Sequence, residues 1–157
     1  MNKIQRKRFE KLMNHLASGK LGLDKFDYGT WYAKRDCGTC GCALGECTVV
    51  FPKQWKARAL SVTLSDEYIV TGPSDRGDPS EDAAEFFGIS HEDAECIFCG
   101  EPLITGDWET AHVWIPELSM TDSTTAAQVA ARMKKYLKLY DSIEFWQARA
   151  NYEVGQP

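Results

Sequence analysis

The sequence has no long hydrophobic run and no leader-like start. No stretch of its 157 residues approaches the ~18 consecutive apolar residues that suggest a membrane span. Residues 1–16, MNKIQRKRFEKLMNHL, carry positive charge but no apolar core or cleavage-like end, so we expect no secretory signal. Both absences favour a cytoplasmic protein with no membrane partner. In that reducing compartment the six cysteines are expected as thiols, metal ligands or transient redox partners, not as structural disulfides.

Histidine is scarce, and the common catalytic motifs are missing. The three histidines are His15, His91 and His112. No His-Glu-x-x-His, phosphate-binding loop, Gly-x-Ser-x-Gly or dinucleotide glycine pattern occurs. A zinc deaminase would need His-x-Glu well before Pro-Cys-x-x-Cys, whereas here HED lies just before CIFC and no proline precedes that pair. The sequence indicates no enzymatic activity, so a protein that binds another molecule is the preferred interpretation.

Internal repeats, low-complexity tracts and interdomain linkers are also absent. A length of 157 residues fits one domain, and a hydrophobic share of 43% with 11% aromatic residues is typical of a packed globule. We therefore expect a single domain over residues 1–157, with a frayed tail at 152–157.

Hydrophobic periodicity and capping residues predict about five helices. The first covers residues 3–17, where apolar side chains recur at helical spacing, namely Phe9, Leu12, Met13 and Leu16. Two short helices end near Phe87 and Phe98, the first capped by Ser80 or Asp78 and the second opened by Ser90 with Asp93. A long helix begins at the Thr125 and Gln128 capping pair and continues, after Tyr140, to Trp146.

The cysteine-rich segment and two polar stretches complete the predicted fold. Helical spacing places a fifth helix over residues 40–51, capped by Thr39 or Asp36, after a loop at 22–36. The alternation over residues 60–65, followed by EYIVT, predicts a small β-hairpin, and one further strand is expected at 112–115. The predicted fold class is mainly α (α+β), a compact helical domain of about five helices with a small β-hairpin.

Charge is unevenly distributed along the chain. Residues 66–110 hold 13 acids and one base, whereas the rest of the chain holds 10 acids and 17 bases. These charges either meet across the fold and solvate it, or form two faces that each steer a partner. The basic side of the first helix and a nearby tryptophan are the candidate binding residues: Lys3, Arg6, Lys7, Arg8, Lys11 and Trp31.

The cysteines allow three interpretations. Two Cys-x-x-Cys-Gly units, CGTCG and CIFCG, could hold structural zinc through Cys37, Cys40, Cys96 and Cys99. Unpaired cysteine is also among the most buried residue types, so the same thiols could simply pack in the core. A redox pair in CGTC is the third possibility, although no βαβ pattern surrounds it. Residues alone leave packing, zinc and redox chemistry open.

Part of the chain resembles a known group of proteins. The pattern F-D-x-x-x-W followed by C-G-T-x-x-C-x-x-G matches at Phe26, Asp27, Trp31, Cys37, Gly38, Thr39, Cys42 and Gly45. Such a pattern is similar to that of uncharacterised small phage, prophage and bacterial proteins, and AAEFFGISHEDAECIF and TAAQVAARMKKYL resemble later helices of that group. The resemblance implies a compact helical domain and no assigned activity. It places Cys37 and Cys42 at a packed helix start, and Glu46 departs from the aromatic residue or histidine usual there.

We expect a small cytoplasmic accessory protein of the phage or prophage kind. It would bind a host or phage protein through the basic face. The second candidate surface is the acidic face around Glu81–Glu95, which could mimic nucleic acid to a DNA-binding partner. Nucleic acid is a less favoured partner, because the net charge is −5 and no DNA-binding motif occurs. The alternatives are a structural zinc-binding domain with four cysteine ligands, or a thiol-centred protein that binds a small ligand around Cys37, Cys40, Trp31 and His112. The expected cofactor is none or structural zinc.

Overall fold

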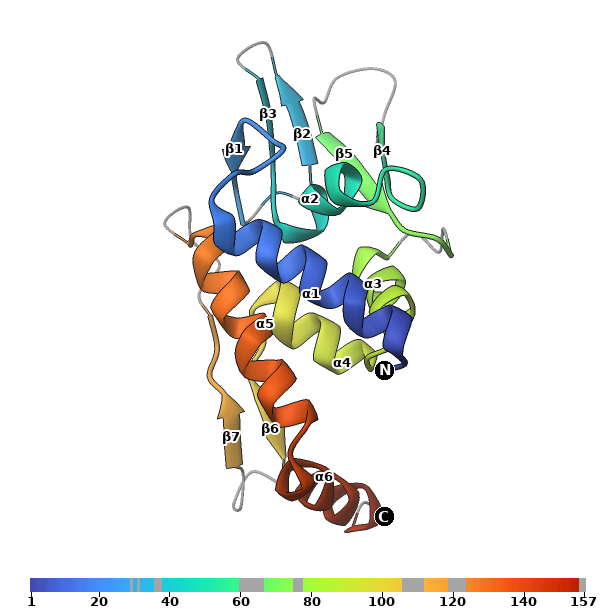
Figure 1. Cartoon of the computed structure of the whole chain (residues 1–157), viewed down its shortest axis with the longest axis vertical. Helices are drawn as coiled ribbons and strands as arrows, with labels where there is room; N and C mark the ends of the chain where they lie inside the picture. The colour runs from blue at the N-terminus through green and yellow to red at the C-terminus, as the bar shows by residue number, and fades with distance from the viewer. Residues whose placement is uncertain are drawn as a thin grey trace.

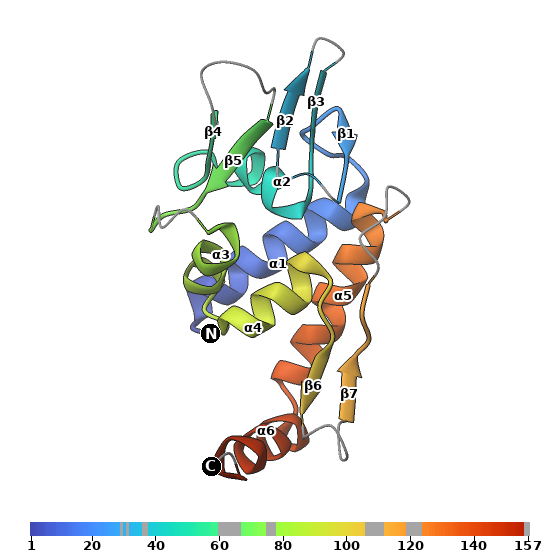
Figure 2. The same ribbon diagram turned by 180° about the vertical axis from the view of Figure 1, so that it is seen from behind.

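A five-stranded sheet, a layer of helices and a two-stranded hairpin follow one another along the long axis of the molecule (Figure 1). The computed structural model describes residues 1–28, 30, 32–35, 38–59, 67–74, 78–105, 112–118 and 124–155. The middle layer holds α1, α3, α4 and α5, α2 lies against the sheet, and α6 lies beside the hairpin at the far end (Figures 1 and 2).

Three helices, α3, α4 and α5, begin at capping residues expected from the sequence. Thr125 and Gln128 form the predicted capping box, and Asp78 and Ser90 each accept a backbone N–H at the start of a helix. The described helices are α1 (Lys3–Ser18), α2 (Ala43–Val50), α3 (Pro79–Phe87), α4 (His91–Ala94) continuing into the π-helical turn η1 (Glu95–Cys99), α5 (Ala126–Tyr140) and α6 (Ile143–Gly155). The last helix therefore continues well beyond Trp146, where the predicted helix ends.

The strands form two separate sheets. The larger sheet has the order β1-β3-β2-β5-β4, with β1 (Lys25–Phe26), β2 (Tyr32–Arg35), β3 (Gly38–Gly41), β4 (Lys56–Ala59) and β5 (Glu67–Thr71). Only the β1–β3 pair within it is parallel. The smaller sheet is the antiparallel pair β6 (Leu103–Thr105) and β7 (His112–Ile115). The predicted fold class, mainly α with an α+β arrangement, is confirmed.

The predicted helix over residues 40–51 is wrong at its start. Cys40 lies in β3, where it pairs with Lys25 on one side and with Ala33 on the other, and Thr39 is also a strand residue. The helix begins only after Cys42. A strand hydrogen-bonded on both sides gains more from sheet pairing than from one further helical turn, and local spacing does not reveal those partners. The segment 22–36, predicted as a loop, contributes β1 and β2 for the same reason.

One of the two strands of the predicted β-hairpin, EYIVT, is confirmed. EYIVT forms β5, which pairs with β4 in the register Lys56↔Thr71 to Ala59↔Tyr68. The alternating stretch 60–65 lies outside the described residues.

The core lies where α1 meets α5 and α3. Phe9, Leu12 and Leu16 of α1 are fully buried, as their helical spacing predicts. The Phe9 ring lies 5.6 Å from the Phe87 ring and 5.9 Å from the Tyr136 ring, centroid to centroid. These contacts place α1 at the centre of the helical layer. One face of the helix is buried in the core, and the basic candidate residues lie on the same helix.

A buried carboxylate attaches the last helix to the core. Asp93 is 1% exposed and accepts hydrogen bonds from Arg149 of α6 at 2.8 and 3.0 Å and from the Tyr136 hydroxyl at 2.9 Å. Arg149 also donates to Ser90 and Glu92. Because the carboxylate is withdrawn from water, its two partners are essential to its burial.

We expect Asp93→Ala to lower the free energy of unfolding by about 3–5 kcal/mol, because it removes the carboxylate shared by a buried hydroxyl and a guanidinium. Urea unfolding followed by circular dichroism measures this. The matched control is Glu92→Ala, whose side chain is 77% exposed and should cost less than about 1 kcal/mol. Equal losses in the two variants would contradict the structural role assigned to Asp93.

Candidate functional site

Three of the five predicted basic residues of α1 hold the fold together. Arg8 donates to the Phe86 carbonyl at 3.3 Å and lies over the Phe86 ring, and Lys11 donates to the Val50 carbonyl at 3.0 Å. These carbonyls belong to the last turns of α3 and α2, where a cation is favoured by the helix dipole. Arg6 pairs with Glu10 and Asp141, and its hydrogen bonds lower the pKa of the Asp141 carboxyl.

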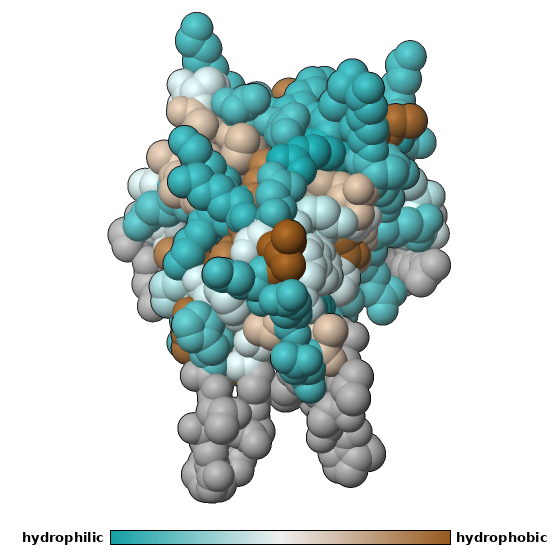
Figure 3. All heavy atoms as spheres, turned by 60° about the horizontal axis from the view of Figure 1, so that its bottom comes forward, coloured by the Kyte–Doolittle hydropathy of each residue, from teal (hydrophilic) through white to brown (hydrophobic). Residues whose placement is uncertain are grey.

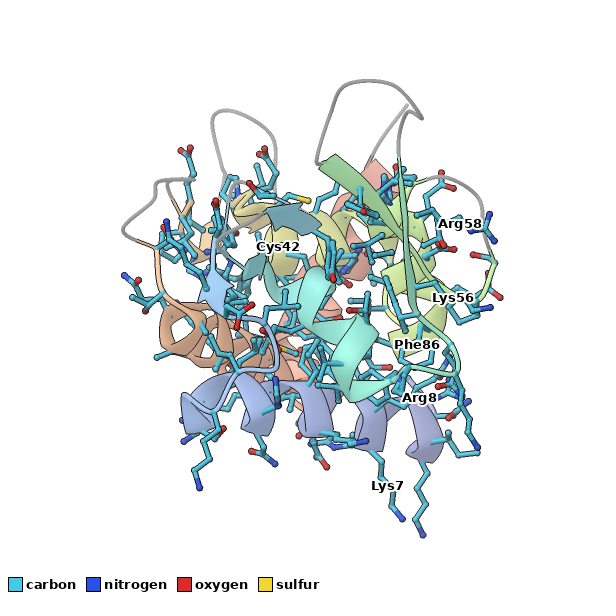
Figure 4. The ribbon with its side chains drawn as sticks, turned by 90° about the horizontal axis from the view of Figure 1, so that it is seen from above. Lys7, Arg8, Cys42, Lys56, Arg58 and Phe86 are labelled. Carbon is cyan, nitrogen blue, oxygen red and sulfur yellow. The ribbon has the colours of Figure 1, made fainter. Side chains whose placement is uncertain are left out.

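Lys3 and Lys7 extend into solvent and form no ion pair in the part of the chain that the structure describes. Figure 4 shows Lys7 pointing away from the body of the molecule, whereas Arg8 turns back towards Phe86. Lys11 is also exposed, although its ammonium group is hydrogen-bonded. Helical spacing of four residues places all three lysines on one ridge of α1. The outer ridge of α1 is therefore basic, as predicted.

A second basic row, which the sequence reasoning missed, lies on α5. Lys134, Lys135 and Lys138 are all exposed, and the neighbouring buried residues Met133, Tyr136 and Leu137 face the core. The sequence feature that indicates this row is the segment MKKYLK. Its apolar residues have helical spacing, and all the residues between them are lysines.

The two rows are neighbours because α1 and α5 pack side by side in opposite directions (Figure 1). Arg6 of α1 meets Asp141 after α5, and at the other end Leu16 and Ala126 line one apolar pocket of about 320 Å³. We name the exposed lysines of this helix pair the basic helix face: Lys3, Lys7, Lys11, Lys134, Lys135 and Lys138. With the lower end of Figure 1 turned forward, the coloured surface is largely hydrophilic, with scattered hydrophobic residues (Figure 3).

Other exposed cations lie elsewhere. Lys53 and Lys56 are exposed at the connection from α2 to β4, and Figure 4 shows Lys56 and Arg58 on β4, away from Lys7. They provide lysines of similar exposure outside the basic helix face.

The acidic run does not form one continuous face. Asp82 is fully buried and accepts the backbone N–H of Gly72 at 2.6 Å and the hydroxyl of Ser74. Asp93 is buried as described above, whereas Glu81 and Glu92 are exposed. Part of the charge asymmetry in the sequence is therefore internal to the fold.

His15 belongs to a buried network. Its Nε2 lies 2.7 Å from Oε2 of Glu46, a side chain with no exposed surface. The same carboxylate accepts the backbone N–H groups of Gly22 at 2.9 Å and Leu23 at 3.0 Å. A Cβ at Gly22 would lie 2.2 Å from a methyl carbon of Val49, so glycine is needed where this loop approaches α2. The network holds the α1–β1 connection in place.

The other two histidines are both exposed, and His112 lies apart from Cys40, with which it was predicted to share a site. His112 is exposed on β7 at the hairpin end and packs edge-to-face against Trp114, with ring centroids 4.4 Å apart. Cys40 lies in β3 at the opposite end, so a site combining these two residues is wrong (Figure 1). His91 is exposed near the start of α4, where its Nε2 lies 3.1 Å from the hydroxyl of Ser80.

Four cysteines are described in full, and all are thiols. Cys42 is the N-cap residue of α2, and Cys47 lies within that helix; both are buried. Cys96 is buried in η1, and Cys99 at the end of η1 is half-buried. Burial raises the pKa of Cys42 to about 11, although the N–H groups of Gly45 and Leu44 act in the opposite direction. Burial also raises the pKa of Cys96 to about 11, against the effect of the adjacent Arg132, and that of Cys99 to about 12.

The predicted zinc quartet is only partly covered by the structure. Cys37 and Trp31 lie outside the described residues, and Cys40 is described in its backbone alone. Cys96 receives a hydrogen bond from Arg132 at 3.5 Å. Among the described residues, no three side chains of histidine, cysteine, aspartate or glutamate are grouped as metal ligands. Zinc binding by Cys37, Cys40, Cys96 and Cys99 stays a prediction.

No family model, curated protein or solved structure matches the chain. Within the described ranges, no helix has the length and apolar character needed to cross a membrane.

We expect Glu46→Ala to lower the free energy of unfolding by about 3 kcal/mol or more, since three donors lose one buried acceptor. His15→Ala should cost about 1–2 kcal/mol, because both backbone donors keep their acceptor. Thermal and urea unfolding measure both values. Glu10→Ala, which removes an exposed pair on α1, is the control at less than about 1 kcal/mol. A Glu46→Ala loss no larger than that of Glu10→Ala would refute the network's role.

The raised pKa values predict slow alkylation of the native thiols. With folded pKa values of about 11 to 12, the thiolate fraction of Cys42, Cys96 and Cys99 falls as pH drops below that range. Reaction with iodoacetamide should therefore accelerate about tenfold per pH unit between pH 8 and 10, and sharply on unfolding. Peptide mapping by mass spectrometry resolves each cysteine. A native Cys96 that reacts at pH 8 as fast as in the unfolded chain would rule this out.

Proposed function

We propose that the protein binds an acidic protein partner through the basic helix face. The supporting observation is the side-by-side packing of α1 and α5, each with a row of exposed lysines on its outer side. Two lysine rows on a rigid helix pair offer several ammonium groups in fixed register to a complementary acidic surface. Such complementarity raises association rates and selects against like-charged partners.

The anchoring contacts of α1 support the proposal physically. Arg8 and Lys11 hold α1 against the ends of α3 and α2, and Arg6 with Asp141 joins α1 to the end of α5. The ridge that carries Lys3 and Lys7 is therefore positioned by its neighbours. A partner that meets this ridge does not need to order a loop, which lowers the entropic cost of binding.

A protein partner is favoured over nucleic acid on charge. The whole chain carries −5, and exposed acids such as Glu81 and Glu92 lie on the adjacent α3 and α4. A long polyanion would contact both signs of charge, whereas a partner of limited size can match the basic helix face alone. Together with the resemblance in sequence, this supports a cytoplasmic accessory protein of the phage or prophage kind.

The test combines Lys7→Glu and Lys135→Glu, one reversal in each row. We expect this variant to bind a fluorescein-labelled oligoglutamate peptide at least about tenfold more weakly than the unaltered chain, since each reversal replaces an attraction by a repulsion. Fluorescence anisotropy at 50 and 200 mM salt measures the dissociation constants, and affinity should fall as salt rises.

The matched control reverses Lys53 and Lys56, which are also exposed but lie outside the basic helix face. That variant should remain within about twofold of the unaltered chain. Equal weakening by both double variants would mean non-specific charge binding and would contradict the proposed site. Tighter binding to duplex DNA than to the peptide, lost in the Lys7/Lys135 variant, would assign the face to nucleic acid instead.

A further inference from the structure

The apolar pocket named above lies where the end of α1 meets the start of α5. Figures 1 and 2 both place these two helix ends beside β1. Three large side chains line the pocket: Leu16 of α1, Leu21 of the loop that follows, and Phe26 of β1. Leu16 belongs to the buried core, and the half-buried Leu21 and Phe26 pack against that core. The apolar lining of the pocket is therefore continuous with the interior of the protein.

Small residues keep the mouth of the pocket open. Ala17, Gly19 and Ala127 also line it, and all three are exposed. Gly19 ends α1 with a φ of 66°, and a Cβ there would have no atom of the described residues within 4 Å. Large side chains at these three positions would cover the apolar lining. As the chain stands, that lining is accessible from solvent.

The size of the pocket indicates what it can hold. Its volume of about 320 Å³ lies at the small end of the range of about 300–1,000 Å³ that is usual for ligand sites. Such a volume suits one bulky aliphatic or aromatic side chain. Transfer of that side chain from water into an apolar pocket is favourable in proportion to the area buried.

The pocket and the basic helix face belong to the same pair of helices. Lys11 lies five residues before Leu16 in α1, and Lys134 lies seven residues after Ala127 in α5. At a rise of about 1.5 Å per residue, the lysines begin about 7–10 Å from the pocket along the helix axes. An extended segment covers about 3.3 Å per residue, so about three residues connect the two sites. One segment of a partner can therefore reach both.

We propose that the acidic partner inserts one bulky apolar side chain into this pocket, with acidic residues about three positions away on the basic helix face. This inference rests on the proposed function and narrows the partner to an acidic segment with an apolar anchor. The lysines attract the segment and speed its association, because opposite charges act over a distance. The pocket adds a contact that a simple polyanion lacks, and buried aromatic anchors commonly dominate the energy of an interface.

Two fluorescein-labelled peptides test the anchor, Phe-Ser-Ser-oligoglutamate and Ala-Ser-Ser-oligoglutamate, each made in both chain directions with the label at the glutamate end. In one direction the Phe peptide should bind at least about tenfold more tightly than its Ala counterpart, because the ring leaves water. Fluorescence anisotropy measures both dissociation constants. Salt screens the glutamate contacts, whereas the ratio between the two peptides should persist as salt rises.

The variant Ala127→Phe tests the pocket itself by placing a ring at its mouth. We expect it to bring the Phe and Ala peptides to within about twofold of each other, with the affinity for the Ala peptide unchanged. That unchanged affinity also shows that the variant folds. The matched control is Ala150→Phe, the same substitution at an exposed residue of α6 outside the pocket, which should keep the full advantage of the Phe peptide.

The outcomes separate this inference from the proposed function. No advantage of the Phe peptide in either direction, or an advantage that survives Ala127→Phe, would overturn the anchor. Binding of the Ala peptide that is lost in the Lys7/Lys135 variant would still support the basic helix face. An equal advantage of Phe on an uncharged serine peptide would assign the pocket to free apolar ligands and overturn its link to an acidic partner. If neither acidic peptide binds, the proposed function is wrong and the inference with it.

Discussion

The buried carboxylate of Glu46 is the constraint on which the upper half of the molecule depends. The Glu46 side chain has no exposed surface, so the hydrogen-bond donors to its carboxylate oxygens must come from the protein itself. The His15 imidazole hydrogen-bonds to the carboxylate from α1. The backbone N–H groups of Gly22 and Leu23 donate to it from the loop that leads to β1. One side chain of α2 therefore sets the distance between the first helix and the first strand. The parallel pairing of β1 with β3, and with it the position of Phe26, follows from that attachment.

Cationic side chains in this fold donate hydrogen bonds to backbone carbonyl groups as well as to carboxylates. Arg8 and Lys11 reach the last turns of two helices, and the buried Arg132 donates to the carbonyls of Cys96, Pro116 and Glu101. A guanidinium directed at several carbonyls fastens η1 to the segments on either side of the hairpin without a buried ion pair. Apart from Lys11, the lysines of the basic helix face make no such contact among the described residues. The structure therefore distinguishes cations that form internal hydrogen bonds from cations that are available to a partner. Composition alone does not make that distinction.

Local patterns predicted those elements that local energetics decide. The helix spacing of Phe9, Leu12 and Leu16 and the capping box at Thr125 depend on neighbours within one turn, and both are confirmed. Cys40 was misplaced because its strand partners, Lys25 and Ala33, are chosen by sheet pairing. The candidate site divides in the same way. The ridge of α1 was visible in the sequence, whereas the packing of α1 against α5 joins residues far apart in the chain.

The two edge strands of the five-stranded sheet are β1 and β4. The first edge is only two residues long, which gives another chain little backbone to pair with. The longer edge, β4, carries Lys56 and Arg58, two residues apart and both exposed. A second molecule that added its own β4 there would bring like charges together as the strands aligned. The charge on this edge therefore disfavours growth of the five-stranded sheet into intermolecular β-structure.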